Sequence, residues 1–278
     1  MASPFSFEED LMKTKRILQI ITLLLIIAAA VCGYFFAIDY MATQEEIAEY
    51  SSLRSIYTSI TNESVIESTD PTEQAEPEET AGLLIVDVDF DALLAINPDT
   101  VGWIAIPDTV ISYPVVRAAN NTKYLATSFE GNYSRAGTPF ANRDNNMESL
   151  DYNTIIYGHN MGVGRSDMFS TLLLYKEYEY FATNRFIQFD TIYQRHGFWK
   201  VFAVIELNAH NIDFHSQQIL FQDDDEFMEW IAQAMSLSIH DTDTEITPQD
   251  YILTLSTCDR SRYGRNGRLL MLAVKLSH

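Results

Sequence analysis

The stretch Tyr251-Ile-Leu-Thr-Leu-Ser-Thr-Cys258 and the run Arg268-Leu-Leu-Met-Leu-Ala-Val-Lys-Leu276 decide the fold of this 278-residue chain. Both are rich in the branched and aliphatic residues that strands favour, and polar residues separate them. The intervening loop contains two glycines, so the two runs predict a hairpin with a long loop. Such a hairpin places the Cys258 side chain, at the end of one strand, beside the Arg268 side chain, at the start of the next.

Cys258 has no cysteine to pair with in the globular part of the chain, because the other cysteine, Cys32, lies in an N-terminal apolar segment. A lone cysteine is most often a small buried hydrophobe, but its neighbours here indicate chemistry. The strand-like run Asn153-Thr-Ile-Ile-Tyr-Gly158 leads into His159, so a thiol, an imidazole and a guanidinium each stand at a strand end. A thiolate nucleophile, a proton carrier and a fixed cation together suit acyl transfer.

These residues also resemble a known family. Thr254-Leu-Ser-Thr-Cys258, with Arg268 ten positions later and Tyr157-Gly-His159 upstream, is similar to the active-site signature of sortases, the cysteine transpeptidases of Gram-positive cell surfaces. Two further segments, 97–107 and 111–116, resemble the start of class B members. The resemblance covers roughly residues 85–278.

The resemblance implies a catalytic set and a reaction. Cys258 attacks the carbonyl of a Thr residue in the C-terminal sorting motif of a secreted protein, His159 protonates the departing amine, and Arg268 hydrogen-bonds the oxyanion or the carbonyls of the motif. An amine from peptidoglycan or its lipid-linked precursor then resolves the acyl-enzyme. No cofactor is implied.

Three more residues are candidates for substrate binding. Ser256 and Thr257 immediately precede the nucleophile. Asn121 matches an Asn that class B sortases place before a Tyr-Leu pair near the active site, although a loop Asn in a turn would look the same.

The loop after the nucleophile carries Arg260, Arg262 and Arg265. One interpretation is a solvated loop whose arginines pair with nearby acids such as Asp259. The other is that the loop concentrates positive potential at the mouth of the cleft and docks an anionic acceptor, such as a stem-peptide carboxylate or a lipid pyrophosphate.

A metal site is not predicted. His210 and His215 flank Asp213, but their spacing suits no helix face, and two imidazoles in a polar loop are usually solvated.

The N-terminal region predicts a signal anchor. Residues 17–38 are uncharged and, as a helix, would span about 33 Å, enough to cross the hydrocarbon core of a membrane. Basic residues precede this segment and acidic residues follow it, so the positive-inside rule makes 1–16 a cytoplasmic tail and places the remainder outside the cell. A cleaved signal peptide is the alternative, but the apolar run is longer than a usual h-region.

Residues 39–82 are expected to form an acidic extracellular stalk. Their net charge is −10 of the −21 of the whole chain, and their second half is too polar to order itself. Residues 44–56 could instead extend the membrane helix. The remaining −11 belongs to a catalytic domain at 83–278, and this negative charge argues against nucleic acid as a partner.

The domain at 83–278 is predicted to be mainly β: an eight-stranded sortase-type β-barrel with a few peripheral helices, preceded by the transmembrane helix. The expected strands are 102–106, 110–116, 136–141, 153–158, 186–193, 198–208, 251–257 and 268–276. The expected helices are 89–95, 167–174 and 224–238. The first and last of these helices are also class B features.

Three other functions fit parts of the sequence. A membrane-tethered cysteine peptidase would use the same thiol and imidazole but pass the acyl group to water. A pilin-polymerising sortase is disfavoured because Asp70-Pro71 precedes Thr72, where such enzymes place an aromatic lid residue. A non-enzymatic surface receptor is disfavoured by the intact set of Cys258, His159 and Arg268.

Overall fold

The computed structural model describes residues 4–61, 83, 85–162, 164–210 and 214–276. It divides into two compact units, Met1–Glu49 and Tyr50–His278. Helix α1 (Pro4–Tyr57) provides the described part of the first unit and reaches into the second. The long apolar helix expected at 17–38 is therefore present, and its length and composition are sufficient to cross a membrane.

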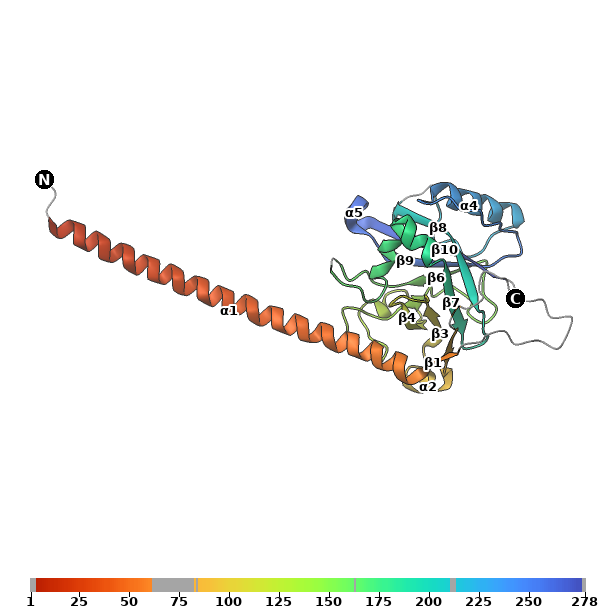
Figure 1. The fold of residues 1–278 in the computed structure, drawn as a ribbon, viewed down its shortest axis with the longest axis horizontal. Coiled ribbons are helices and arrows are strands. Elements are labelled where there is room, and N and C mark those ends of the chain that lie inside the picture. Colours follow the sequence, from red (N-terminus) through yellow and green to blue (C-terminus); the bar gives the residue numbers. More distant parts are fainter. Residues whose placement is uncertain (1–3, 62–82, 84, 163, 211–213, 277–278) are drawn as a thin grey trace. The chain divides into compact units, whose positions relative to one another are not determined.

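The second unit is built on a closed eight-stranded barrel in the order β10-β8-β7-β3-β4-β5-β6-β9 (Figure 1). The expected mainly β barrel is confirmed, and each predicted strand contributes one of its members. The strands are β3 (Thr100–Ala105), β4 (Ser112–Val116), β5 (Phe140–Ala141), β6 (Asn153–Tyr157), β7 (Phe186–Thr191), β8 (Phe198–Asn208), β9 (Ile252–Cys258) and β10 (Gly267–Lys275).

The strand expected at 136–141 is much shorter than predicted. The Ser134 hydroxyl accepts hydrogen bonds from the backbone N–H groups of Ala136 and Gly137, and Gly137 adopts a φ of +61°. This side-chain-capped turn keeps the chain out of the sheet until Phe140.

The helix expected at 167–174 is present only in part and as a 3-10 helix, η3 (Ser170–Lys176), followed by helix α3 (Tyr178–Thr183). Met168 has a φ of +53°, so the helical turns begin only after it. The other two predicted helices are present as α2 (Phe90–Ile96) and α4 (Asp224–Leu237). Short helical turns also occupy loops: η2 (Lys123–Leu125), α5 (Arg260–Tyr263) and η4 (Gly264–Asn266).

Both faces of the central hairpin are buried, which explains why apolar residues occupy both alternating sets of positions along its strands. Leu253, Leu255 and Met271 belong to the core inside the barrel. Ile252 and Leu270, on the outer face, pack in a second cluster with α4, which lies over β8 and β10 in Figure 1. Because side chains alternate along a strand, Cys258 and Arg268 follow on this outer face.

The compact unit also includes the end of α1. Tyr50 and Leu53 are buried in the core, and strand β1 (Thr58–Thr61) pairs antiparallel with β2 (Ile85–Val88). The extension of the helix through 44–56 is thus observed, whereas most of the stretch expected to be a flexible tether, 62–82, lies outside the described residues. The division into tail, anchor, stalk and catalytic domain stays a prediction.

His196 gives the fold a pH-dependent stability. Its ring is buried against Phe189, and burial, together with the charge of Lys275, lowers the pKa of His196 from 6.5 to about 4. The unfolded chain then binds the proton more readily, so stability is lost as the pH falls from about 6.5 towards about 4. Between pH 7 and pH 5 the protonation of this group should lower the free energy of unfolding by about 2 kcal/mol.

We expect denaturant titrations of His196→Gln to show a smaller fall in the free energy of unfolding between pH 7 and pH 5 than the parent protein shows. An equal fall in both proteins would contradict the role given to His196.

Candidate active site

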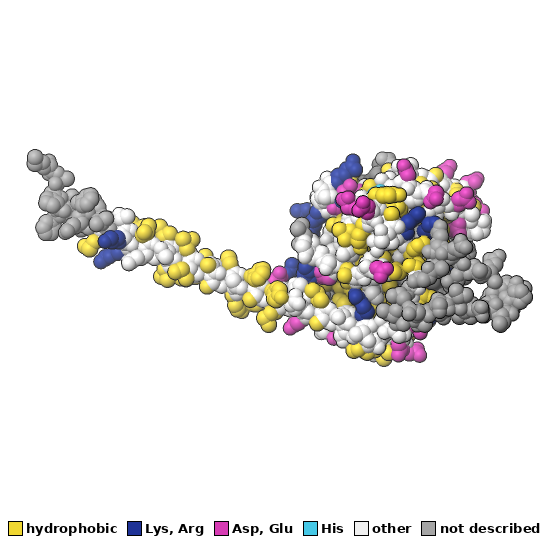
Figure 2. Space-filling view, viewed as in Figure 1, with side chains coloured by type: hydrophobic (Ala, Val, Ile, Leu, Met, Phe, Trp, Pro, Cys, Tyr) yellow, Lys and Arg dark blue, Asp and Glu magenta, His cyan; other side chains and the backbone are white. Residues whose placement is uncertain are grey.

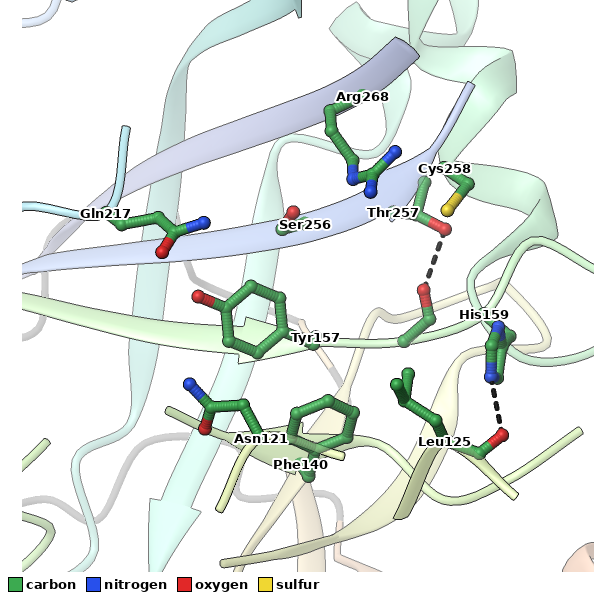
Figure 3. Close-up of a pocket in the computed structure, with 11 residues that line it drawn as sticks. Asn121, Leu125, Phe140, Tyr157, His159, Gln217, Ser256, Thr257, Cys258 and Arg268 are labelled. Carbon is green, nitrogen blue, oxygen red and sulfur yellow. Dashed lines mark hydrogen bonds between the residues drawn. The ribbon is translucent and has the colours of Figure 1, made fainter. Parts of the chain in front are cut away.

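The hairpin pairing brings two of the expected site residues together. Strands β9 and β10 are antiparallel, and Cys258 is the direct cross-strand partner of Arg268. Directly opposed residues point to the same face of a sheet with their Cβ atoms about 5 Å apart. Figure 3 accordingly shows the Arg268 side chain beside Thr257 and Cys258.

Strand β6 delivers the histidine to the same place. It runs parallel to β9, with Tyr157 paired to Ser256, and Gly158 continues the pairing by donating its N–H to the Ser256 carbonyl at 3.1 Å. The Thr257 hydroxyl donates to the Gly158 carbonyl at 2.8 Å. His159 therefore leaves β6 at the level where Cys258 leaves β9.

One pocket holds all six residues predicted for catalysis and substrate binding (Figure 3). It is lined by Asn121, Leu125, Phe140, Tyr157, Gly158, His159, Gln217, Ser256, Thr257, Cys258 and Arg268.

A carbonyl orients the His159 ring. Nε2 lies 2.8 Å from the Leu125 carbonyl oxygen. A carbonyl can only accept, so the hydrogen bond assigns the proton to Nε2 and leaves Nδ1 on the opposite side of the ring. Gly158, the preceding residue, allows close packing, because a Cβ there would meet the Phe169 ring at 2.5 Å.

The Arg268 side chain is oriented by its own loop. Its Nη1 donates to the carbonyls of Arg265 and Gly267 at 3.2 and 2.9 Å. Gly267 is required for this turn, because a Cβ would lie 1.8 Å from the Asp259 carbonyl oxygen. The loop thus closes tightly beside the nucleophile, and its carbonyls direct the guanidinium.

Asp259 does not pair with the arginines that follow it. Its buried carboxylate forms an ion pair with Lys176 of η3 and accepts from the Ser261 N–H at 2.9 Å. Burial alone would raise the pKa of Asp259, but the Lys176 ammonium and the Ser261 N–H outweigh it and hold the pKa below its ordinary value. Lys176 also contacts Glu206 of β8 at 2.9 Å, so this cluster fastens the loop after Cys258 to the barrel.

Arg260, Arg262 and Arg265 are exposed beside the pocket but do not line it. Among the residues that the structure describes, none of the three has an ion-pair partner, although the Arg262 guanidinium lies 5.2 Å from the centre of the Tyr263 ring. Figure 2 shows basic side chains along the edge where α5 lies in Figure 1, and acidic side chains over α4.

The wall around Asn121 is a connected set of amides. Its Oδ1 accepts from the Arg143 N–H at 2.8 Å, and its Nδ2 donates to Asn142 at 3.3 Å. Asn142 in turn donates to the Tyr157 hydroxyl at 3.0 Å. Burial raises the pKa of Tyr157, so this phenol stays neutral and available as a donor.

Sequence reasoning missed five lining residues as site residues: Leu125, Phe140, Tyr157, Gly158 and Gln217. Leu125 and Tyr157 lie within motifs already quoted and were within reach of the same argument. Gln217 comes from the connection between β8 and α4, where no local pattern marks it. No group of three metal-ligating side chains occurs within the described residues, and Asp213 lies outside them.

Comparison with known proteins decides the family. No model of a known protein family matches the chain. It is 31% identical over 179 residues to the sortase B of Listeria monocytogenes serovar 1/2a (strain ATCC BAA-679 / EGD-e), covering 64% of this chain and 70% of that protein. It is 27% identical over 268 residues to the sortase B of Staphylococcus aureus (strain NCTC 8325 / PS 47), and the match covers 96% of this chain and 100% of that protein.

The chain belongs to the sortase family and is class B-like. The structure of a Staphylococcus aureus sortase B–substrate complex matches this sortase with a TM-score of 0.61 and 30% identity, over 68% of this chain and 85% of that one. The chain is therefore an enzyme of the cysteine transpeptidase family, and its barrel is the sortase barrel.

Proposed function

We propose that this sortase is a membrane-anchored cysteine transpeptidase that cleaves a C-terminal sorting motif of secreted proteins and joins the new Thr carboxyl to a cell-wall amine. The observation that carries the proposal is the meeting of Cys258, Arg268 and His159 at one pocket, each delivered by a different strand end. The solved complex of a relative with its substrate supports a sorting signal as the substrate class.

The proposed acylation uses all three residues. The Cys258 thiolate adds to the scissile Thr carbonyl, and the Arg268 guanidinium donates to the oxyanion that forms. The intermediate then collapses, the carbon–nitrogen bond breaks, and the amine leaves with a proton from the His159 imidazolium. The hydrogen bond from Nε2 to Leu125 leaves Nδ1 as the ring position that exchanges this proton.

Deacylation reverses these roles. The acceptor amine adds to the thioester carbonyl, neutral His159 takes the proton that the amine loses, and the thiolate of Cys258 leaves. Asn121, Ser256 and Thr257 are proposed to hold the sorting motif beside the nucleophile. The Thr257 hydroxyl does this indirectly, because it is committed to the Gly158 carbonyl.

The N-terminal helix is proposed to be a single-pass anchor with the N-terminus in the cytoplasm and the barrel outside the cell. Its support is the length and apolar composition of α1 and the basic residues that precede the apolar segment.

Cys258→Ala should abolish turnover without unfolding the chain, because a half-exposed thiol at a strand end contributes little packing. Full-length protein in detergent would be given a sorting peptide with and without triglycine, and products identified by mass spectrometry. We expect parent protein to form the amide when triglycine is present. Hydrolysis that is insensitive to the amine would instead support the peptidase alternative, and wild-type cleavage by Cys258→Ala would overturn the nucleophile assignment.

Arg268→Lys and His159→Ala should each lower activity by at least ~100-fold, the usual range for losing an oxyanion donor or an acid catalyst. Lysine keeps the charge but loses the planar fork that the carbonyls of Arg265 and Gly267 orient. Initial rates of peptide cleavage measure both effects. Near-normal activity in Arg268→Lys would mean that charge alone is needed.

Arg260, Arg262 and Arg265 are proposed to dock an anionic acceptor, such as a stem-peptide carboxylate or a lipid pyrophosphate. The alternative, in which Asp259 neutralises the arginines, loses its basis because Lys176 takes that carboxylate. An exposed cationic loop in a domain of net charge −11 would focus positive potential at the pocket mouth.

Changing these three arginines to Gln should leave cleavage of a neutral sorting peptide nearly intact but lower transfer to a peptidoglycan fragment, with the deficit shrinking as salt rises. Arg195→Gln, exposed and outside the pocket, is the matched control. Acceptor docking would be excluded if peptide cleavage and acyl transfer lost activity equally. It would also be excluded if neither rate fell at low salt.

A further inference from the structure

We propose that Tyr50 and Arg54, at the end of α1, are positioning residues for His159. The proposal rests on the role given to His159 above and adds residues that lie outside the pocket. Tyr50 and the neighbouring Leu53 are only 4% and 3% exposed, so this segment is part of the core of the compact unit.

A first path leads from Tyr50 to the His159 ring. The Tyr50 hydroxyl donates to the Gly137 carbonyl at 2.5 Å and lies 3.1 Å from the Thr138 hydroxyl. Gly137 in turn packs against the backbone of Tyr124 and Leu125, since a Cβ on it would lie 2.3 Å from the Tyr124 carbonyl oxygen.

The Thr138 N–H reinforces this packing by donating to the same Tyr124 carbonyl at 3.1 Å. The next carbonyl along, that of Leu125, accepts from His159 Nε2. The Tyr50 hydroxyl thus fixes the turn at Gly137 and Thr138. This turn supports the Leu125 carbonyl, which binds the His159 ring.

A second path leads from the same helix end to the His159 backbone. The Tyr50 and Tyr113 rings pack edge to face, with their centres 5.5 Å apart. The Arg54 guanidinium lies 5.8 Å from the centre of the Tyr113 ring. Arg54 also donates to the Val110 carbonyl at 2.8 Å. The Tyr113 hydroxyl then accepts from the Met168 N–H at 3.0 Å.

Met168 and Phe169 close the loop that follows His159. Met168 holds a φ of +53°, and the Phe169 N–H donates to the His159 carbonyl at 2.9 Å. The Phe169 ring fills the space that Gly158 leaves. Two loops outside the sheet are therefore held by the end of α1: Tyr50 supports the loop that binds the His159 ring, and Tyr50 and Arg54 together support the loop that binds the His159 backbone.

This arrangement has a kinetic consequence that packing alone would not have. If α1 only filled space, Tyr50→Phe, which keeps the ring, would change stability and leave the reaction untouched. If the hydroxyl positions the Leu125 carbonyl, its loss lets the His159 ring rotate and its proton redistribute between the two nitrogens.

The experiment uses the full-length chain in detergent. In Tyr50→Phe we expect kcat for peptide cleavage to fall about tenfold with KM nearly unchanged, the size expected for losing one supporting hydrogen bond. The ring ¹⁵N signals of His159, assigned with His159→Gln, should change from a fixed Nε2–H tautomer to an average of the two. Tyr113→Phe, which removes the acceptor for Met168, should also lower kcat.

Ser51→Ala is the matched control, because Ser51 is exposed on the same turn of α1. The proposal would be overturned if Tyr50→Phe kept the kcat and the His159 ring signals of the parent protein. It would also be overturned if Tyr50→Phe lowered kcat no more than Ser51→Ala does. If His159→Ala itself retains activity, the proposed catalytic role fails instead, so the two failures are distinguishable.

Discussion

The antiparallel register of β9 and β10 is the constraint on which the site depends. It makes Cys258 the partner of Arg268, and a slip of one residue would send these side chains to opposite faces of the sheet. The register is held by core packing on both faces of the hairpin and by the tight closure at Gly267, where any side chain would collide with the Asp259 backbone. The parallel pairing of β6 with β9 then brings His159 to the same level.

Much of this arrangement was accessible from sequence, because β-branched and aliphatic residues mark the buried strands. The eight strands and the hairpin follow from such local patterns, whereas the predicted pocket residues rest largely on the resemblance to the sortase signature. The errors arose where a single backbone conformation decides the outcome. Met168, at positive φ, delays the helix expected at 167–174 until Ser170, and the capped turn at Ser134 shortens the strand expected at 136–141.

Contacts between distant segments could not be read from the chain. The sequence favours the neighbouring arginines as one set of partners for Asp259, but the barrel brings Lys176 to it from another loop. Tyr50 was placed in a polar stalk, although its ring is buried against Tyr113. In both cases residues far apart in sequence complete the surroundings of the site. The same segments fasten the loops that present Arg268 and His159, so the pocket relies on more of the fold than its lining residues.

The most direct test of the account is to trap the acyl-enzyme. Full-length protein would be mixed with a sorting peptide in the absence of an amine, quenched in acid and mapped by mass spectrometry after digestion. The account predicts the mass of the N-terminal peptide fragment, as a thioester, on Cys258, and its conversion to an amide when triglycine is added before quenching. Amide formation with no adduct on Cys258, or an adduct on another residue, would contradict it.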